Sequence, residues 1–119
     1  MDKSETYIKM SDCPEIQEQR NYSMPNSWAG LFRDNDDVFI QLKGLRIVWL
    51  PRQDQLQEML KEVNQYYDTW VVKLKRFYDF AFAIKADSNT PDTMEQLWLA
   101  FVMNERYSKV WNGEEWITS

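Results

Sequence analysis

The chain has 119 residues, enough for one hydrophobic core, and we expect a single domain over residues 1–119. Apolar residues make up 44% and charged residues 28%, which is close to the globular average and excludes wholesale disorder. The formal net charge of −5 disfavours binding to nucleic acid or to an anionic membrane, because both kinds of binding need a positive field.

The expected compartment follows from the cysteine content and the apolar runs. The single cysteine, Cys13, cannot form an internal disulfide, which suits a reducing compartment. The N-terminal residues lack the apolar stretch of a signal peptide, and no apolar run approaches the ~18 residues that a membrane span needs. We therefore expect a soluble protein of the cytoplasm with no membrane contact.

Residues 1–30 are polar and form the least regular part of the sequence. A short helix over residues 14–19 is predicted, since Pro14 suits a first helical turn. The first few residues are expected to be loosely ordered. Three apolar residues indicate that the segment nevertheless docks on the body of the domain: Tyr7, Met10 and Ile16.

A β-hairpin is predicted over residues 38–49. Residues 38–42 and 45–49 are rich in β-branched and aromatic side chains, and Lys43-Gly44 joins them. Upstream, the acidic turn at residues 34–37 allows a third strand over residues 28–32.

The first of three longer predicted helices covers residues 52–64. Pro51 ends the second strand and suits the opening of a helix. Apolar residues then recur with the i, i+3, i+4, i+7 spacing of one helical face: Leu56, Met59, Leu60 and Val63.

Residues 68–82 are predicted to form the second helix, with Asp68 as its N-cap. A strand is the alternative for residues 70–84, because apolar side chains also alternate there, but Arg76 breaks the alternation and the run is long for a strand. In the helix, we expect an inner apolar face and an opposite polar face with Lys73, Arg76 and Asp79. The inner face contains Trp70, Leu74, Phe77, Ala81 and Ile84.

The third helix is predicted over residues 93–107, after a loop over residues 86–92. Thr93 and Gln96 have the spacing of a capping box, and the middle of the segment is apolar on nearly all sides. This helix should therefore be the most buried element. Asn112-Gly113 then indicates a tight turn between two short extended segments. Whether one of these segments adds a strand to the hairpin over residues 38–49 is left open by the sequence. The expected fold class is α+β, a small antiparallel sheet packed with about three helices.

Three blocks of the sequence resemble a family of small uncharacterised proteins encoded by phages and prophages of Gram-positive, clostridia-like bacteria. The blocks cover under half of the chain: residues 8–17 (IKMSDCPEIQ), residues 48–59 (VWLPRQDQLQEM), and residues 94–103 with 107–116 (MEQLWLAFVM and YSKVWNGEEW). The resemblance implies a phage origin and expression inside a bacterial host cell. It implies no activity and no catalytic residue.

The side chains that most catalytic and metal sites need are scarce. Histidine is absent, which removes the commonest general base and metal ligand, and one cysteine cannot build a zinc site. Cys13 has no histidine to activate it and is expected to be an inert thiol. Asp34, Asp36 and Asp37 do not continue into a calcium-loop pattern and are interpreted as a solvated turn. We expect no enzyme activity, no cofactor and no metal.

Two groups of residues are candidates for binding. Trp111 and Trp116 lie in turn-rich sequence and are expected to be partly exposed, as a protein-contact or sugar-stacking surface or as flat covers of the core, whereas Trp49 and Trp98 are expected in the core. Lys73, Lys75 and Arg76 form the one close basic cluster, a candidate nucleic-acid contact or simply a solvated helix face. We therefore predict a non-enzymatic accessory protein that contacts another protein or itself, with a nucleic-acid-associated module as the alternative.

Overall fold

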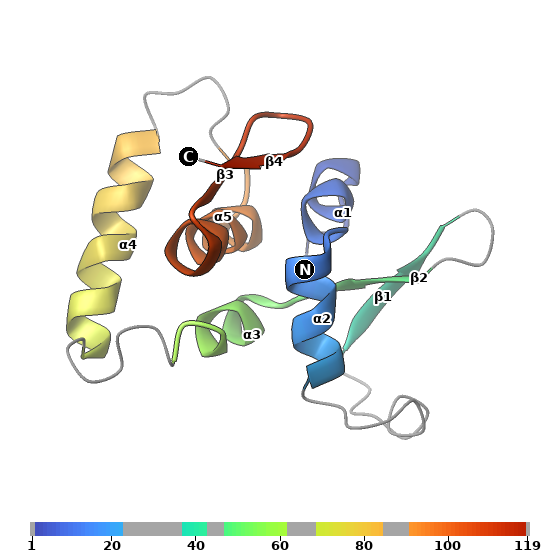
Figure 1. Cartoon of the computed structure of the whole chain (residues 1–119), viewed down its shortest axis with the longest axis horizontal. Helices are drawn as coiled ribbons and strands as arrows, with labels where there is room; N and C mark the ends of the chain where they lie inside the picture. Colours follow the sequence, from blue (N-terminus) through green and yellow to red (C-terminus); the bar gives the residue numbers. More distant parts are fainter. Residues whose placement is uncertain (1, 23–36, 43–46, 62–68, 85–90, 119) are drawn as a thin grey trace.

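The computed structural model describes residues 2–22, 37–42, 47–61, 69–84 and 91–118, which fold as an α+β domain (Figure 1). The helices are α1 (Glu5–Ser11), α2 (Pro14–Tyr22), α3 (Gln53–Glu58), α4 (Trp70–Ile84) and α5 (Met94–Tyr107). The strands are β1 (Val38–Gln41), β2 (Ile47–Leu50), β3 (Lys109–Trp111) and β4 (Trp116–Thr118). The α+β class is confirmed. No helix in these ranges has the length and apolar character needed to cross a membrane.

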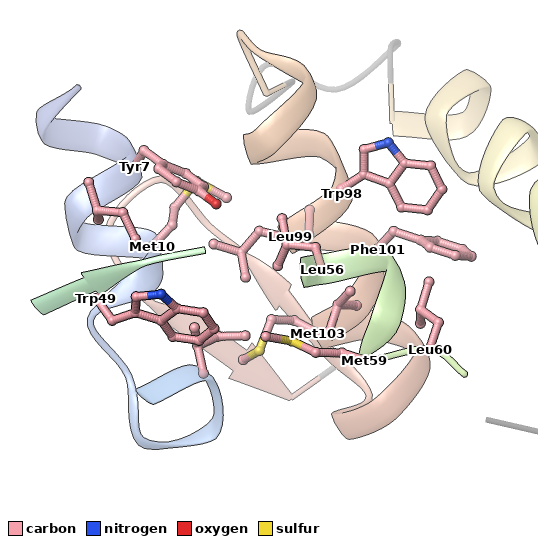
Figure 2. Close-up of a cluster of buried hydrophobic side chains, with 14 of the residues drawn as sticks. Tyr7, Met10, Trp49, Leu56, Met59, Leu60, Trp98, Leu99, Phe101 and Met103 are labelled. Atoms are coloured by element: carbon pink, nitrogen blue, oxygen red, sulfur yellow. The ribbon is translucent and has the colours of Figure 1, made fainter. Parts of the chain in front are cut away.

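Helix α5 is the centre of the domain, as predicted. It contacts α1, α3, α4 and β3, and its residues 98–103 are all buried. In Figure 1 it lies between α4 on one side and the α1–α2 pair on the other. Thr93 is its N-cap, because the Thr93 hydroxyl accepts a hydrogen bond from the backbone N–H of Gln96 (3.2 Å). The core around it combines side chains from α1, α2, β2, α3 and α5 (Figure 2).

The N-terminal segment docks on this core through two helices, of which the sequence analysis predicted only α2. Ser4 caps α1 by accepting a hydrogen bond from the N–H of Tyr7, and the Tyr7 side chain is fully buried. The Tyr7 hydroxyl donates to the carbonyl of Pro51 (2.6 Å). Asp2 accepts hydrogen bonds from Thr93 (2.6 Å) and Gln96 (2.9 Å), which ties the start of the described chain to the N-terminus of α5.

The predicted hairpin is confirmed in β1 and β2, which pair antiparallel with Val38 opposite Leu50 and Gln41 opposite Ile47. The free edge of β2 is partnered by a side chain: the Gln17 amide donates to the carbonyl of Trp49 (2.9 Å) and accepts from its N–H (3.0 Å). Gln17 thus replaces one residue of a neighbouring strand. The described strands form two separate two-stranded sheets, so β3 and β4 do not extend this hairpin.

The helix in residues 52–64 is shorter than predicted. Regular α3 ends at Glu58 and continues as turns to Lys61. Four predicted features lie outside the described residues: the third strand at 28–32 with Trp28, the Lys43-Gly44 connection, the Asp68 cap and residues 86–90 of the loop. Within the acidic turn only Asp37 is described, and it accepts a hydrogen bond from the Gln55 amide (2.7 Å).

Residues 70–84 form helix α4, which decides against the strand alternative. The predicted faces of this helix are right for Phe77 on the inner side and Asp79 on the outer side, but wrong for three other residues. Lys73 is buried, whereas Trp70 and Leu74 are about half exposed. The Phe77 ring stacks on Trp98 at 3.7 Å between centroids, and Phe80 packs against Phe101 at 5.4 Å. These rings fix the inner face. Apolar residues occur on almost every side of α4, so periodicity alone does not identify the side that faces the core.

Candidate functional site

The C-terminal hairpin presents the two candidate tryptophans side by side. Strands β3 and β4 pair antiparallel with Trp111 opposite Trp116. The Asn112 side-chain oxygen accepts hydrogen bonds from the backbone N–H groups of Glu114 and Glu115 (both 2.8 Å), and Gly113 has a φ of 103°. Asn112 suits this position because its side chain forms an Asx turn, and Gly113 suits it because glycine adopts a positive φ without strain. The predicted turn is confirmed.

Trp111 and Trp116 are both half-buried, as expected, but they have different surroundings. Their rings meet at 5.0 Å between centroids with an interplanar angle of 61°. The indole N–H of Trp116 donates to the carbonyl of Met10 (2.9 Å), which fastens the hairpin to α1. Trp116 therefore holds the hairpin in place. Both rings line one hollow of the surface, and Trp111 also lines a second, mostly apolar hollow that Trp116 does not reach.

That hollow, which we call the Trp111 groove, lies between α4, α5 and the C-terminal hairpin. Its volume is about 260 Å³. Its walls are mostly apolar side chains: Phe80, Ile84, Pro91, Ala100, Val110, Trp111, Asn112 and Ile117. Pockets for drug-sized ligands have volumes of roughly 300–1,000 Å³. The groove is therefore sized for one or two apolar side chains.

Sequence reasoning found Trp111 but not the other walls of the groove. Phe80 and Ile84 are four residues apart and lie on one side of α4, which was the available signal. Ile117 faces them from the last strand. No local pattern indicates that these segments meet, because they are brought together only by the packing of α4 on α5.

Acidic side chains line two other hollows that share Trp111 with the groove, and we call these carboxylates its acidic rim. Asp92 lines a smaller hollow together with Trp111 and Gly113. Glu114 and Glu115 line another hollow that Trp111 also reaches. All three carboxylates are exposed. Lys9 lies 4.0 Å from Glu114, but both side chains are largely in solvent, where such pairs contribute little. Lys9 and Lys109 also line the hollow of Glu114 and Glu115, but carboxylates outnumber them there, so the rim favours a cationic neighbour.

The candidate basic cluster is not one exposed face. The Lys73 ammonium points inward and donates to the carbonyls of Leu60 (2.8 Å) and Lys61 (3.2 Å). Together with Arg106, which donates to the carbonyl of Met59 (2.6 Å), it satisfies the carbonyls after α3. Cations at this end of a helix interact favourably with its dipole. Lys73 therefore acts as a structural cap.

The other two members of the cluster also differ from each other. Arg76 is half-buried and donates to the Glu105 carboxylate on α5 at 3.2 Å. Lys75 is exposed and pairs with Asp79 at 3.0 Å. A backbone-tracking nucleic-acid site needs several free cations on one surface. Of the three predicted residues, only Lys75 presents its ammonium to solvent.

No family of proteins, curated protein or solved structure matches this chain. The comparisons therefore point to no ligand for the groove. Within the described residues, no three His, Cys, Asp or Glu side chains are grouped so that they could hold a metal ion.

Cys13 is a protonated thiol at neutral pH. Its Sγ donates to the carbonyl of Met10 (3.7 Å), and burial raises the pKa of the Cys13 thiol to about 12. A thiolate is the nucleophilic form of cysteine, so this side chain is poorly suited to covalent catalysis.

We expect Cys13 to react with iodoacetamide at pH 7.5 at least 100-fold more slowly than the same cysteine in the urea-unfolded chain, since the raised pKa removes thiolate. The folded-state pKa lies above the unfolded value, so the protonated thiol favours the native state below about pH 9, and that contribution is lost as the pH rises toward 12. Mass spectrometry of timed alkylation measures the rate. Equal rates in the folded and unfolded chain would contradict the burial of the thiol.

Proposed function

We propose that this chain is a non-enzymatic accessory protein of phage or prophage origin, and that it acts by binding another protein at the Trp111 groove. The observation that carries the proposal is the combination of an apolar groove of side-chain size with an exposed acidic rim. A buried aromatic anchor surrounded by a polar rim is the usual anatomy of a protein-contact site. The phage origin rests on the resemblance of residues 8–17, 48–59, and 94–103 with 107–116.

The occupant that fits this groove is a protein segment with one large apolar side chain next to lysine or arginine. The apolar walls take the side chain, because its burial removes apolar surface from water. The carboxylates of Asp92, Glu114 and Glu115 attract the neighbouring cation, and the net charge of −5 adds to that field. A sugar is a poorer fit, because the groove offers few polar groups to bind hydroxyls.

The absence of histidine and the raised pKa of Cys13 support the non-enzymatic part of the proposal. The buried position of Lys73 and the ion pair of Arg76 with Glu105 make the nucleic-acid alternative the weaker of the two. Gene neighbours with structural, replication or lysis roles would identify the process in which such a phage protein takes part.

The proposal is tested with a random peptide library displayed on phage, selected against the folded chain. We expect enriched sequences with an aromatic or branched aliphatic residue next to Lys or Arg. Trp111→Ala should weaken binding of a selected peptide by roughly 30-fold, the effect of losing a contact worth about 2 kcal/mol. Isothermal titration calorimetry measures the affinity.

Phe82→Ala is the matched control, because Phe82 is an exposed aromatic residue of α4 that does not line the groove. It should leave the affinity for the peptide unchanged. Selected peptides that lack an apolar anchor, or that bind Trp111→Ala as well as the unchanged chain, would refute the proposal.

A further inference from the structure

Helix α4 lies at the edge of the domain with α5 on one side of it (Figure 1). Its surface includes an exposed apolar stripe. Four residues form the stripe: Val71 (77% exposed), Leu74 (50%), Tyr78 (69%) and Phe82 (73%). Their spacing of three, four and four residues keeps them on one side of an α-helix. Monomeric proteins rarely expose large apolar patches, so this α4 stripe is a candidate contact surface.

The two halves of the α4 stripe differ in the kind of apolar side chain that they expose, so the stripe can pair with a second copy of itself. The aliphatic residues Val71 and Leu74 lie in its N-terminal half, and the aromatic residues Tyr78 and Phe82 lie in its C-terminal half. The exposed Lys75 and Asp79 lie along one flank and are joined by an ion pair of 3.0 Å. A second helix in the opposite direction therefore meets aromatic rings with aliphatic side chains and each charge with its opposite.

We infer that two copies of this chain associate through their α4 stripes in an antiparallel arrangement. A two-fold axis near the middle of α4, between residues 76 and 77, places Val71 opposite the partner copy's Phe82. It places Leu74 opposite the partner copy's Tyr78. Such an isologous contact uses one patch twice and closes as a dimer.

The charged flank selects the antiparallel direction. In an antiparallel pair, the two-fold axis leaves the flanks of both helices on the same side, so Lys75 of each copy lies near Asp79 of the other. In a parallel pair the two flanks lie on opposite sides of the interface, and neither charge meets its opposite. Complementary charge fixes orientation more than it adds affinity. The apolar residues of the α4 stripe supply the affinity.

This dimer uses a surface other than the Trp111 groove. Phe80 and Ile84 of α4 line the groove, whereas Val71, Leu74, Tyr78 and Phe82 do not. Self-association therefore leaves the groove open and presents two copies of it. The dimer does not depend on the proposed peptide binding, and each can fail without the other.

Sedimentation equilibrium over a range of concentrations tests the inference with the full chain. We expect a monomer–dimer equilibrium, with Phe82→Glu raising the dissociation constant by at least roughly 30-fold, since each dimer contains the substitution twice. Circular dichroism checks that the variant is folded. A strict monomer across the whole range, or a folded Phe82→Glu variant that dimerises normally, would overturn the inference.

A charge exchange tests the direction. Lys75→Asp and Asp79→Lys should each weaken the dimer, because like charges then meet across the axis, and the double variant Lys75→Asp/Asp79→Lys should restore it. Dimers that ignore all three changes would overturn the antiparallel arrangement. Trp111→Ala should leave the dimer intact. If it dissociates the dimer instead, then the groove carries the self-association and α4 does not.

Discussion

Replacing Phe101 with alanine is expected to lower the free energy of unfolding by about 3–5 kcal/mol, the cost of truncating a buried aromatic residue. Phe101 is 1% exposed, and its ring is at the centre of an aromatic cluster. It meets Phe77 at 5.4 Å, Phe80 at 5.4 Å and Trp98 at 6.0 Å between centroids. Because a domain of this size has only about 5–15 kcal/mol of stability, much of it depends on this one ring.

The same substitution should affect the function of the groove. Phe77 and Phe80 are the α4 residues that pack on Phe101, so a cavity at position 101 loosens α4 from α5. Phe80 is also a wall of the Trp111 groove. We therefore expect Phe101→Ala to speed up amide hydrogen exchange more in α4 than in α1, relative to the unchanged chain. We also expect it to weaken the binding of peptides to the Trp111 groove.

Urea denaturation of the unchanged chain and of Phe101→Ala measures the change in the free energy of unfolding. Phe82→Ala is the control, since its ring is 73% exposed and should change stability by less than about 0.5 kcal/mol when both proteins are kept dilute enough to be monomeric. A loss of under about 1 kcal/mol for Phe101→Ala would show that the aromatic cluster is not the main attachment of α4.

The elements that the sequence predicts well are those whose signals are local. Thr93 caps α5, and the apolar residues that follow are buried on nearly all sides, so the position and burial of this helix follow from a short window. The Asn112-Gly113 turn is equally local, because its asparagine and glycine satisfy the geometry of the turn themselves. In both cases, short-range patterns identify the element.

The features that sequence reasoning missed depend on contacts between distant segments. Gln17 partners the backbone of Trp49 across 32 positions, and nothing near Gln17 indicates that a polar side chain of α2 completes a strand edge. The inner face of α4 is decided by Phe77 and Phe80 against α5, because apolar residues occur on the other sides of the helix as well. The Trp111 groove follows from the same packing, and of its walls only Trp111 was predicted as a contact residue.

Lys73 shows how such a long-range contact changes the meaning of a residue, and its substitution has the second large expected effect. Lys73→Met should lower the free energy of unfolding by about 1.5–3 kcal/mol, the range for hydrogen bonds to a charged group. Methionine retains much of the apolar stem but leaves the carbonyls of Leu60 and Lys61 without their donor. The loss falls at the end of α3, where Lys73 and Arg106 together cap the chain.

Lys75→Met is the matched control for this change. The Lys75 side chain is 74% exposed and its pair with Asp79 is an i,i+4 surface pair, worth about 0.3–0.5 kcal/mol. Urea denaturation of dilute samples should therefore separate the two variants by more than about 1 kcal/mol. A nucleic-acid site along the helix predicts the opposite pattern, in which both substitutions leave stability alone and weaken DNA binding at low salt to a similar extent. Equal stability of the two variants would contradict the capping role of Lys73 and support the nucleic-acid alternative. A lysine cannot at once cap buried carbonyls and contact phosphates.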